Sequence, residues 1–415
     1  MQQELLTTTT STESSTLLKK AVQVCHGIIQ KNISKTGLAA SVDTYPEVWA
    51  RDTVITFLGA AASRDPEMLA AFRISLETLG SNQDRFGQIP FQIRLADNHV
   101  TYGSCDSTMW YVVGCCLYGR RSGDYGWLER HAPSIHKALD WCEMRDFSKS
   151  GLISSLEADD WADLSCHRGQ VLFTNSLMVW ALNDASALLA RSYPKESEHW
   201  ATRAQHSMEA IQRFFWVAPP GSFEDKTHMQ VRAQMSVRLR KLPYFISWIS
   251  VFEFGERFDA PANLLSILTG VATNDQAISI LDYIHQEGLD LPYPVHVIHP
   301  VIMPGERDWR EYYMVWGHGA PYHYQNGGIW PWVGGLYVAA LVRAGLKQRA
   351  YEQLVSLARA LELGKGEPWE CNEWLHGQSG NPMGAKYQAW SAGMFLYAHH
   401  CVQRGEVPEF APHSL

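Results

Sequence analysis

The stretch 152–180 joins an acidic loop to an apolar helical segment. It reads Leu152-Ile-Ser-Ser-Leu-Glu-Ala-Asp-Asp-Trp-Ala-Asp-Leu-Ser-Cys-His-Arg-Gly169, and the segment after it contains Asn175. The carboxylates of the loop lie within seven positions, and they are Glu157, Asp159, Asp160 and Asp163. Mutual repulsion and the neighbouring Trp161 ring would raise one pKa toward neutrality, and a carboxylic acid that stays protonated at pH 7 is what cleavage of a glycosidic bond requires. The alternative is a solvated acidic loop that caps a helix.

The helical segment after Gly169 is one of a series along the chain. Loops rich in Gly, aromatic and acidic residues lead into apolar or amphipathic helices, and short polar turns lead to further helices. The predicted helices begin near Ser15 and cover 17–29, 49–62, 66–79, 106–119, 124–145, 170–192, 195–215, 258–270, 274–286, 328–344, 347–362 and 384–402. Helices in consecutive hairpins predict an all-α fold, an (α/α)6 toroid or six-hairpin barrel, in a single domain.

The distribution of apolar residues separates two rings of helices. The predicted helices after Asp106, Gly169, Gly328 and Gly384 are apolar nearly all round, which favours an inner ring packed on both sides. Others, such as 195–215 and 347–362, carry polar faces and would form the outer ring. The loops that enter the inner helices would share one rim and bring distant residues into one pocket.

The predicted boundaries leave short tails on either side of the barrel. Residues 1–14 are polar and are predicted to be a disordered N-terminal tail, and 406–415 are predicted to be a loose C-terminal tail. The barrel would cover 15–405, with an irregular rim loop near 217–245.

Composition excludes several classes of function. Lys and Arg number 35 against 43 Asp and Glu, for a net charge of −8, so neither nucleic acid nor an anionic membrane is a predicted partner. The eight cysteines form no Cys-x-x-Cys pair, which favours a reducing compartment. The N-terminus lacks a signal-peptide pattern and no apolar run reaches the length of a membrane span, so we expect a cytoplasmic protein. The oligomeric state is not predicted.

Two loops in the first quarter of the chain suit sugar binding. The segment 45–52 places Trp49, Arg51 and Asp52 together before a helix, and a carboxylate beside a guanidinium and a ring can hold vicinal hydroxyls. A structural Arg51–Asp52 ion pair is the alternative. The following loops supply Gln92, Asp106 and Trp110 as further candidates, although Asp106 alone is better explained as a helix N-cap.

The loop 316–332 is dense in rings and hydrogen-bonding groups. Its glycines and proline make it costly to order unless its shape is needed. His318, Asn326 and Trp330 are its candidate sugar contacts. His318 and His323 lack an acidic or Cys partner at ligand spacing, so neither a metal nor another cofactor is predicted.

The segment 367–377 carries the second candidate carboxylate. Glu373 lies between an Asn and a Trp, and Glu370 competes with it. The motif that follows contributes Gln388 and Trp390.

In chain order these motifs resemble a six-hairpin barrel glycosidase over 45–401. They are Trp49-Ala-Arg-Asp52, Gly87-Gln-Ile-Pro90, Asp106-Ser-Thr-Met-Trp110, Asp160-Trp-Ala-Asp163, Asn326-Gly-Gly-Ile-Trp-Pro331, and Glu373 with Gln388-Ala-Trp-Ser-Ala-Gly393. The chain is similar to the amylo-α-1,6-glucosidase domain of glycogen debranching enzymes and to the alkaline/neutral invertases. The resemblance implies Asp163 as general acid and Glu373 as general base. It implies a sugar pocket lined by Trp49, Arg51, Asp52, Asp106, Trp330, Gln388 and Trp390, and we add Gln92, Trp110, Glu157, Trp161, His318 and Asn326 as candidates.

The main prediction is an inverting hydrolase of a small α-glucoside or terminal α-glucosidic linkage, similar to amylo-α-1,6-glucosidase. A sucrose hydrolase of the neutral invertase type is the alternative, and it is weakened because the invertases have paired arginines where Leu164-Ser165 follows Asp163. The inverting mechanism needs carboxyl groups roughly 6.5–9.5 Å apart. Ionised Asp160 or Glu157 would keep Asp163 protonated, and Asp160 is also the competing acid.

Two other classes of protein share this architecture. A sugar 2-epimerase would place paired histidines at the pocket floor. A non-catalytic sugar-binding barrel would keep the aromatic pocket and change no substrate.

Overall fold

The computed structural model describes residues 2–63, 65–94, 96–217 and 242–410. Most of the predicted rim loop at 217–245 and residues 411–415 of the predicted C-terminal tail lie outside these ranges. None of the described helices is both long enough and apolar enough to cross a membrane.

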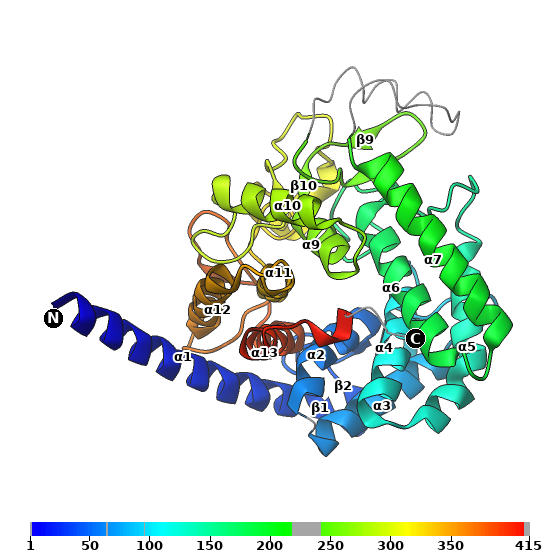
Figure 1. Cartoon of the computed structure of the whole chain (residues 1–415), viewed down its shortest axis with the longest axis horizontal. Coiled ribbons are helices and arrows are strands. Elements are labelled where there is room, and N and C mark those ends of the chain that lie inside the picture. The colour runs from blue at the N-terminus through cyan, green and yellow to red at the C-terminus, as the bar shows by residue number, and fades with distance from the viewer. Residues whose placement is uncertain (1, 64, 95, 218–241, 411–415) are drawn as a thin grey trace.

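The centre of the molecule is a closed ring of buried helices. Its members are α2 (Ala50–Ser63), α4 (Asp106–Ser122), α6 (Leu172–Leu189), α9 (Ala260–Leu268), α11 (Pro331–Arg343) and α13 (Ala389–Arg404). Each contacts the next in this order, and α13 contacts α2, which closes the ring (Figure 1). The prediction that the helices after Asp106, Gly169, Gly328 and Gly384 belong to the inner ring is confirmed.

A second layer of helices surrounds this ring. It consists of α1 (Gln2–Asn32), α3 (Pro66–Ser81), α5 (Tyr125–Glu143), α7 (Pro194–Phe215), α10 (Asn274–Gln286) and α12 (Lys347–Glu362). Each outer helix precedes an inner helix in the chain, so the described residues form the predicted (α/α)6 barrel. The outer helices α7 and α12 bury one side and expose the other, as their sequences predict.

Glycines allow the first and last inner helices to close the ring. A Cβ on Gly59 of α2 would lie 1.8 Å from the carbonyl oxygen of Gly393 in α13, and a Cβ on Gly393 would lie 2.4 Å from the carbonyl oxygen of Thr56. Since no side chain fits at such distances, the α2–α13 contact depends on both glycines.

Short antiparallel strands fasten the loops between helices. They are β1 (Ile33–Ser34), β2 (Gly37–Leu38), β3 (Val48–Trp49), β4 (Gln92–Arg94), β5 (His99–Thr101), β6 (Ser154–Ser155), β7 (Gly169–Val171), β8 (Trp248–Ile249), β9 (Phe254–Gly255), β10 (Phe258–Asp259), β11 (Ile298–His299), β12 (Trp374–Leu375) and β13 (Pro382–Met383). The larger sheets have the orders β3-β4-β5 and β6-β7-β8-β9, and the other pairs are β1-β2, β10-β11 and β12-β13. Strands β3 and β7 lead directly into α2 and α6, so they fix the loops at the mouths of these helices.

The two ends of the chain differ from the prediction. Helix α1 begins at Gln2, earlier than the predicted start near Ser15, because the Ser/Thr run contains no Pro or Gly to stop the helix. The first buried side chain within its described part is Leu18.

The segment after Gly405 is not loose coil up to residue 410. It forms a 3-10 turn, η2 (Pro408–Phe410), in which Phe410 packs on Trp180 with ring centroids 4.1 Å apart. Buried Glu409 forms an ion pair with Arg121 at the end of α4. An apolar ring and a paired carboxylate at the end of the chain explain why this segment packs against the barrel.

Candidate active site

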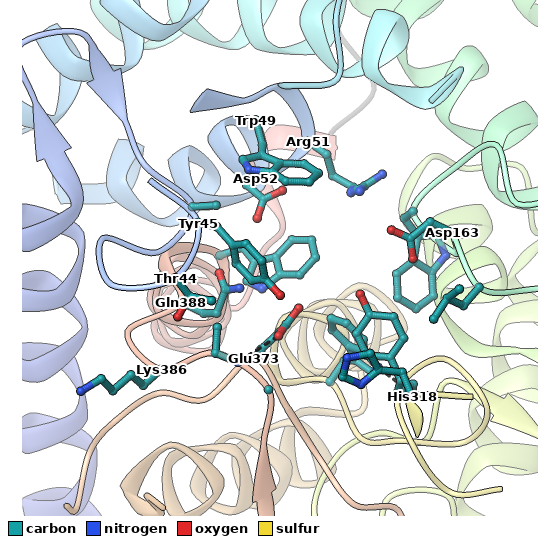
Figure 2. Close-up of a pocket in the computed structure, with 18 of the residues that line it drawn as sticks. Thr44, Tyr45, Trp49, Arg51, Asp52, Asp163, His318, Glu373, Lys386 and Gln388 are labelled. Atoms are coloured by element: carbon teal, nitrogen blue, oxygen red, sulfur yellow. Dashed lines mark hydrogen bonds between the residues drawn. The ribbon is translucent and has the colours of Figure 1, made fainter. Parts of the chain in front are cut away.

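A cavity of about 930 Å³ lies where the loops enter the inner helices (Figure 2). Most of the predicted site residues line it, namely Trp49, Arg51, Asp52, Trp161, Asp163, His318, Trp330, Glu373, Gln388 and Trp390. The structure therefore brings together residues from both ends of the sequence, as the shared rim of inner-helix loops predicts.

Asp163 extends into the cavity from the loop between β6 and β7, which we call the acid loop (residues 156–168). Its carboxylate is accessible from the cavity while protein surrounds it on other sides. Oδ1 accepts a hydrogen bond from Nε2 of Gln325 at 3.0 Å. The surrounding protein raises the pKa of Asp163, whereas Arg51 and the Gln325 hydrogen bond lower it.

Glu373 enters the same cavity from the segment directly before β12. Its backbone N–H donates to the carbonyl oxygen of Ala385 at 2.8 Å, and Oε2 accepts from the N–H of Ala385 at 3.0 Å. Burial is the main cause that raises the pKa of Glu373 to about 7. The Ala385 bond acts to lower this pKa, and the charges of Asp52 and Asp163 help to raise it. The base candidate is thus electrostatically coupled to the acid candidate across one cavity.

Arg51 pairs with Asp106, and not with Asp52 as the alternative interpretation had it. Its Nη1 lies 2.9 Å from Oδ2 of Asp106, and this ion pair is buried. Asp106 is not the N-cap of α4, because Cys105 occupies that position, and Asp106 also accepts from Ser104 Oγ at 2.5 Å. Asp52 is left facing the cavity, where burial raises its pKa to about 6 against the lowering effect of Arg51.

Tryptophans form the walls of the cavity. Trp161 meets Trp330 edge to face at 5.6 Å, and Trp330 meets Trp390 in the same way at 5.7 Å. Among the described residues, the buried indole N–H groups of Trp49, Trp161 and Trp390 have no hydrogen-bond partner. The apolar ring faces that line the cavity suit the faces of a sugar.

Several predicted residues lie outside the cavity wall. Asn326 is buried and accepts from the N–H of Ile302 at 2.7 Å, so it holds a loop and does not line the cavity. Gln92 lies on β4, with Nε2 3.4 Å from Thr101 Oγ1, and buried Trp110 packs on Trp180. Polar or aromatic character alone does not distinguish these structural contacts from sugar contacts.

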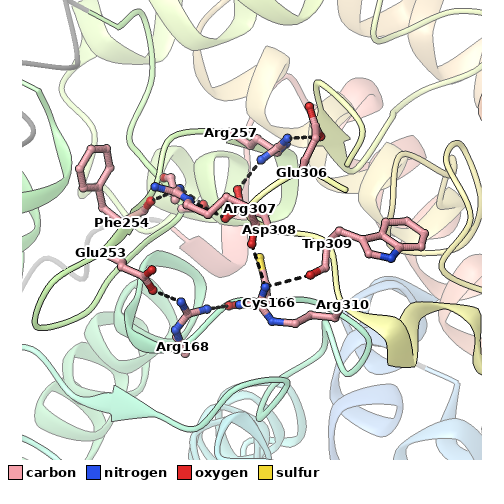
Figure 3. A network of polar contacts seen from close by, with 12 residues as sticks. Cys166, Arg168, Glu253, Phe254, Arg257, Glu306, Arg307, Asp308, Trp309 and Arg310 are labelled. Atoms are coloured by element: carbon pink, nitrogen blue, oxygen red, sulfur yellow. Dashed lines mark hydrogen bonds and ion pairs between the residues drawn. The ribbon is translucent and has the colours of Figure 1, made fainter. Parts of the chain in front are cut away.

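Glu157 belongs to an ion-pair network instead of the sugar pocket. Its carboxylate pairs with Arg168 at 3.0 Å and with Arg310 at 2.9 Å. Arg168 also pairs with Glu253 in the turn between β8 and β9, next to a second cluster around Arg257 (Figure 3). The arginines neutralise Glu157, so it does not keep Asp163 protonated by repulsion, contrary to the prediction.

Asp160 is buried behind the cavity wall. Its Oδ1 accepts from the N–H of Ala162 at 2.8 Å, and burial together with Asp106 raises its pKa well above the usual value. Asp106 is a like charge that raises the pKa of Asp163, and the predicted effect of Asp160 on Asp163 stays a prediction. Glu370 also lies outside the cavity lining and accepts from the backbone N–H groups of 365–367.

Other lining residues were not predicted. They are Ala40, Thr44, Tyr45, Leu164, Tyr324, Lys365, Gly384, Ala385 and Lys386. Tyr45 and Tyr324 stand inside the loops that carry predicted residues, and their positions in aromatic motifs were the available signal. Within the described part of the chain, no group of three or more His, Cys, Asp or Glu side chains is placed to hold a metal ion.

Comparison with known proteins identifies the family. A family described as alkaline and neutral invertase matches residues 235–405. The probable alkaline/neutral invertase D of Arabidopsis thaliana is 34% identical over 411 residues, which cover 85% of this chain and 74% of that protein. This chain belongs to the alkaline/neutral invertase family. It is accordingly a glycoside hydrolase. Cytosolic invertase 1 of Oryza sativa subsp. japonica is 23% identical, over 85% of this chain and 71% of that protein.

Solved structures support the fold of this invertase family member. A GH63 mannosylglycerate hydrolase from Thermus thermophilus matches with a TM-score of 0.67 at 15% identity, over 91% of this chain and 99% of that one. A bacterial glucoamylase complexed with acarbose matches with a TM-score of 0.65 at 13% identity, over 95% and 56% of the two chains. The (α/α)6 barrel is shared with these glycosidases.

Proposed function

We propose that this invertase family member hydrolyses sucrose, with inversion at the glucosyl carbon. The observation that carries the proposal is that Asp163 and Glu373 line one sugar-sized cavity in a chain whose relatives are named invertases. These relatives favour the sucrose alternative over specificity of the amylo-α-1,6-glucosidase type.

The proposed reaction takes place in one step. Asp163 in its protonated form gives its proton to the glycosidic oxygen as the bond to the glucosyl carbon breaks. Glu373 in its ionised form takes a proton from a water molecule, whose oxygen bonds to that carbon from the opposite face. Asp163 ends ionised and Glu373 ends protonated, and proton exchange with solvent restores both.

The surroundings of the two carboxyl groups suit these roles. Enclosure raises the pKa of Asp163, which favours the protonated acid. A pKa of about 7 leaves Glu373 mainly ionised above pH 7 and makes it a stronger base than an exposed Glu. Asp52 would bind hydroxyls of the glucosyl unit, and the rings of Trp49 and Trp390 would pack against the faces of the sugar.

We expect the residues around the leaving group to determine which substrate the protein prefers. Leu164 lines the cavity next to Asp163. In the resemblance to the invertases, this position corresponds to the first of the paired arginines that follow the acid. An apolar contact there binds a neutral leaving group without a charged clamp.

A substrate panel tests the proposal. The protein is incubated with sucrose, isomaltose and trehalose, and the released glucose is measured over time. We expect the highest kcat/KM for sucrose. A preference for isomaltose would restore the α-1,6-glucosidase prediction, isomerised free sugar would indicate an epimerase, and unchanged sugars would indicate a binding protein.

We also propose a reducing location such as the cytoplasm. All eight cysteines of the chain are buried free thiols. Burial raises the pKa of several of them, including Cys105 and Cys116, which keeps the thiols protonated and unreactive.

A further inference from the structure

Gln325 forms hydrogen bonds to the backbone of the acid loop and to the carboxylate of Asp163. Its Nε2 donates to the carbonyl oxygen of Trp161 at 2.6 Å and to Oδ1 of Asp163 at 3.0 Å. Its Oε1 accepts from the N–H of Leu164 at 2.7 Å. One buried amide thus contacts the residue after Asp163, the residue two before it and the carboxylate itself.

These contacts fix the orientation of the Gln325 amide. The N–H of Leu164 can only donate, so the atom facing it must be the amide oxygen. The atom facing Asp163 is therefore the NH2 group, which only donates. Oδ1 of Asp163 is an acceptor, and the proton for the leaving oxygen belongs on Oδ2.

The loop that carries Gln325 is also fastened beside Glu373. Ile329 exchanges two backbone hydrogen bonds of 2.8 and 2.7 Å with Leu375 of β12, two residues after Glu373. The N–H of Gly377 donates to the carbonyl oxygen of Tyr322 at 2.8 Å. Residues 322–329, which we call the bridging loop, therefore connect the acid loop to the strand that follows the base.

We propose that Gln325 is a positioning residue. It fixes where the carboxyl group of Asp163 lies and which of its two oxygens carries the proton, and the bridging loop fixes the distance between Asp163 and Glu373. This inference rests on the proposed hydrolysis, because an inverting reaction requires the two carboxyl groups to be held apart by a sugar and a water. Gln325 does not line the cavity and acts through Asp163.

Other groups also act on the ionisation of Asp163. They come from several elements and are Tyr45, Arg51 and Asp52 near α2, Asp106 of α4, Tyr324 of the bridging loop, and Glu373 before β12. His318 lines the same cavity. A substitution of Gln325 removes none of these groups from the protein, so the lost amide contact is the direct change at Asp163.

The test compares Gln325→Leu with Gln170→Leu. Gln170 is equally buried and its Nε2 also donates twice, to Ser148 and Ser150 at 3.1 Å, but it contacts neither carboxyl group. For Gln325→Leu we expect kcat to fall on the order of 10²-fold, as for a misplaced catalytic group, with KM little changed. Loss of the bond that stabilises ionised Asp163 raises its pKa, so the limb of the kcat/KM profile set by Asp163 moves to higher pH, while the limb near pH 7 set by Glu373 stays.

Gln325→Glu extends the test with nearly the same shape. Its carboxylate repels ionised Asp163 and shifts the limb set by Asp163 in the same direction. Gln170→Leu should leave both limbs and kcat per folded molecule unchanged. Equal effects of Gln325→Leu and Gln170→Leu, or a pH profile in which neither limb moves, would overturn the inference.

Hydrogen exchange gives a result that does not depend on turnover. The N–H of Leu164 should exchange faster in Gln325→Leu than in the unmodified protein, because it loses its partner. Unchanged exchange would show that Gln325 does not hold the acid loop. Absence of hydrolysis by the unmodified protein would instead count against the proposed function alone.

Discussion

The two candidate catalytic carboxylates are held in different ways. Asp163 lies in a loop without regular structure, and a side chain from a distant loop, Gln325, binds it. Glu373 directly precedes a strand, and the backbone of Ala385 both donates to it and accepts from it. The acid should therefore be sensitive to side-chain substitution around it, whereas the base should be sensitive to changes in local backbone shape.

The largest expected effect separates the roles of the two groups. Asp163→Asn and Glu373→Gln should each lower sucrose turnover by about 10² to 10⁴-fold, the usual contribution of a general acid or base. With α-glucosyl fluoride, whose leaving group needs no proton, Asp163→Asn should recover most of its turnover and Glu373→Gln should not. Fluoride release measures this directly, and equal recovery in both variants would reverse or remove the assignment. Asp160→Asn is the control for the choice of acid and should lose far less.

The next effect probes the backbone that shapes the base. Gly384 has φ of +65°, and a Cβ there would lie 2.5 Å from Oε2 of Glu373. Gly384→Ala should displace the carboxylate and lower kcat on the order of 10²-fold. Gly123→Ala is the matched control, because Gly123 has φ of +73° with open space around its Cβ. If both variants lose the same activity, backbone strain and not displacement of Glu373 is responsible.

A smaller effect is expected in the pH dependence of the unmodified protein, which reports the ionisation of Glu373 and Asp163. Glu373 must be ionised to act as base, and its pKa is raised to about 7, so one limb of the kcat/KM profile should lie near pH 7. Asp163 must be protonated to act as acid, so its raised pKa sets the other limb. A profile without a limb near pH 7 would contradict the assignment of Glu373.

The smallest effect concerns stability. The folded-state pKa of Glu373 is raised to about 7 from its unfolded value of 4.5, so this group costs stability progressively as pH rises from about 4.5 to about 7. The cost is constant above pH 7 and vanishes below about pH 4. Glu373→Gln should raise the unfolding free energy by at most about 3 kcal/mol at pH 8 and by little at pH 4. Thermal unfolding at both pH values checks this, and a gain at pH 4 equal to that at pH 8 would oppose it.

Sequence was sufficient for the ring of helices and for most of the cavity. Apolar residues all round the segments after Asp106 and Gly169 mark inner helices, because only a helix packed on both sides tolerates them. Loops before such helices share one rim, so Asp163 and Glu373 were expected to meet, and both line the cavity.

Side-chain partners were not predictable in the same way. Arg51 has neighbouring Asp52 in sequence yet pairs with Asp106 from another helix. Glu157 reads like a pocket residue, but arginines 11 and 153 positions away neutralise it. The sequence around Gln325 does not indicate its role, because that role depends on a hydrogen bond to a loop 162 residues earlier. Such pairings are set by the packed barrel and not by local pattern.

The most direct measurement follows the anomer of the first glucose released from sucrose, by proton NMR within the first minutes of reaction. We expect β-glucose first, with α-glucose appearing later by mutarotation, because water guided by Glu373 attacks the face of the sugar opposite the bond whose oxygen Asp163 protonates. Initial release of α-glucose would mean that the configuration is retained, and it would contradict the pairing of Asp163 and Glu373 as acid and base.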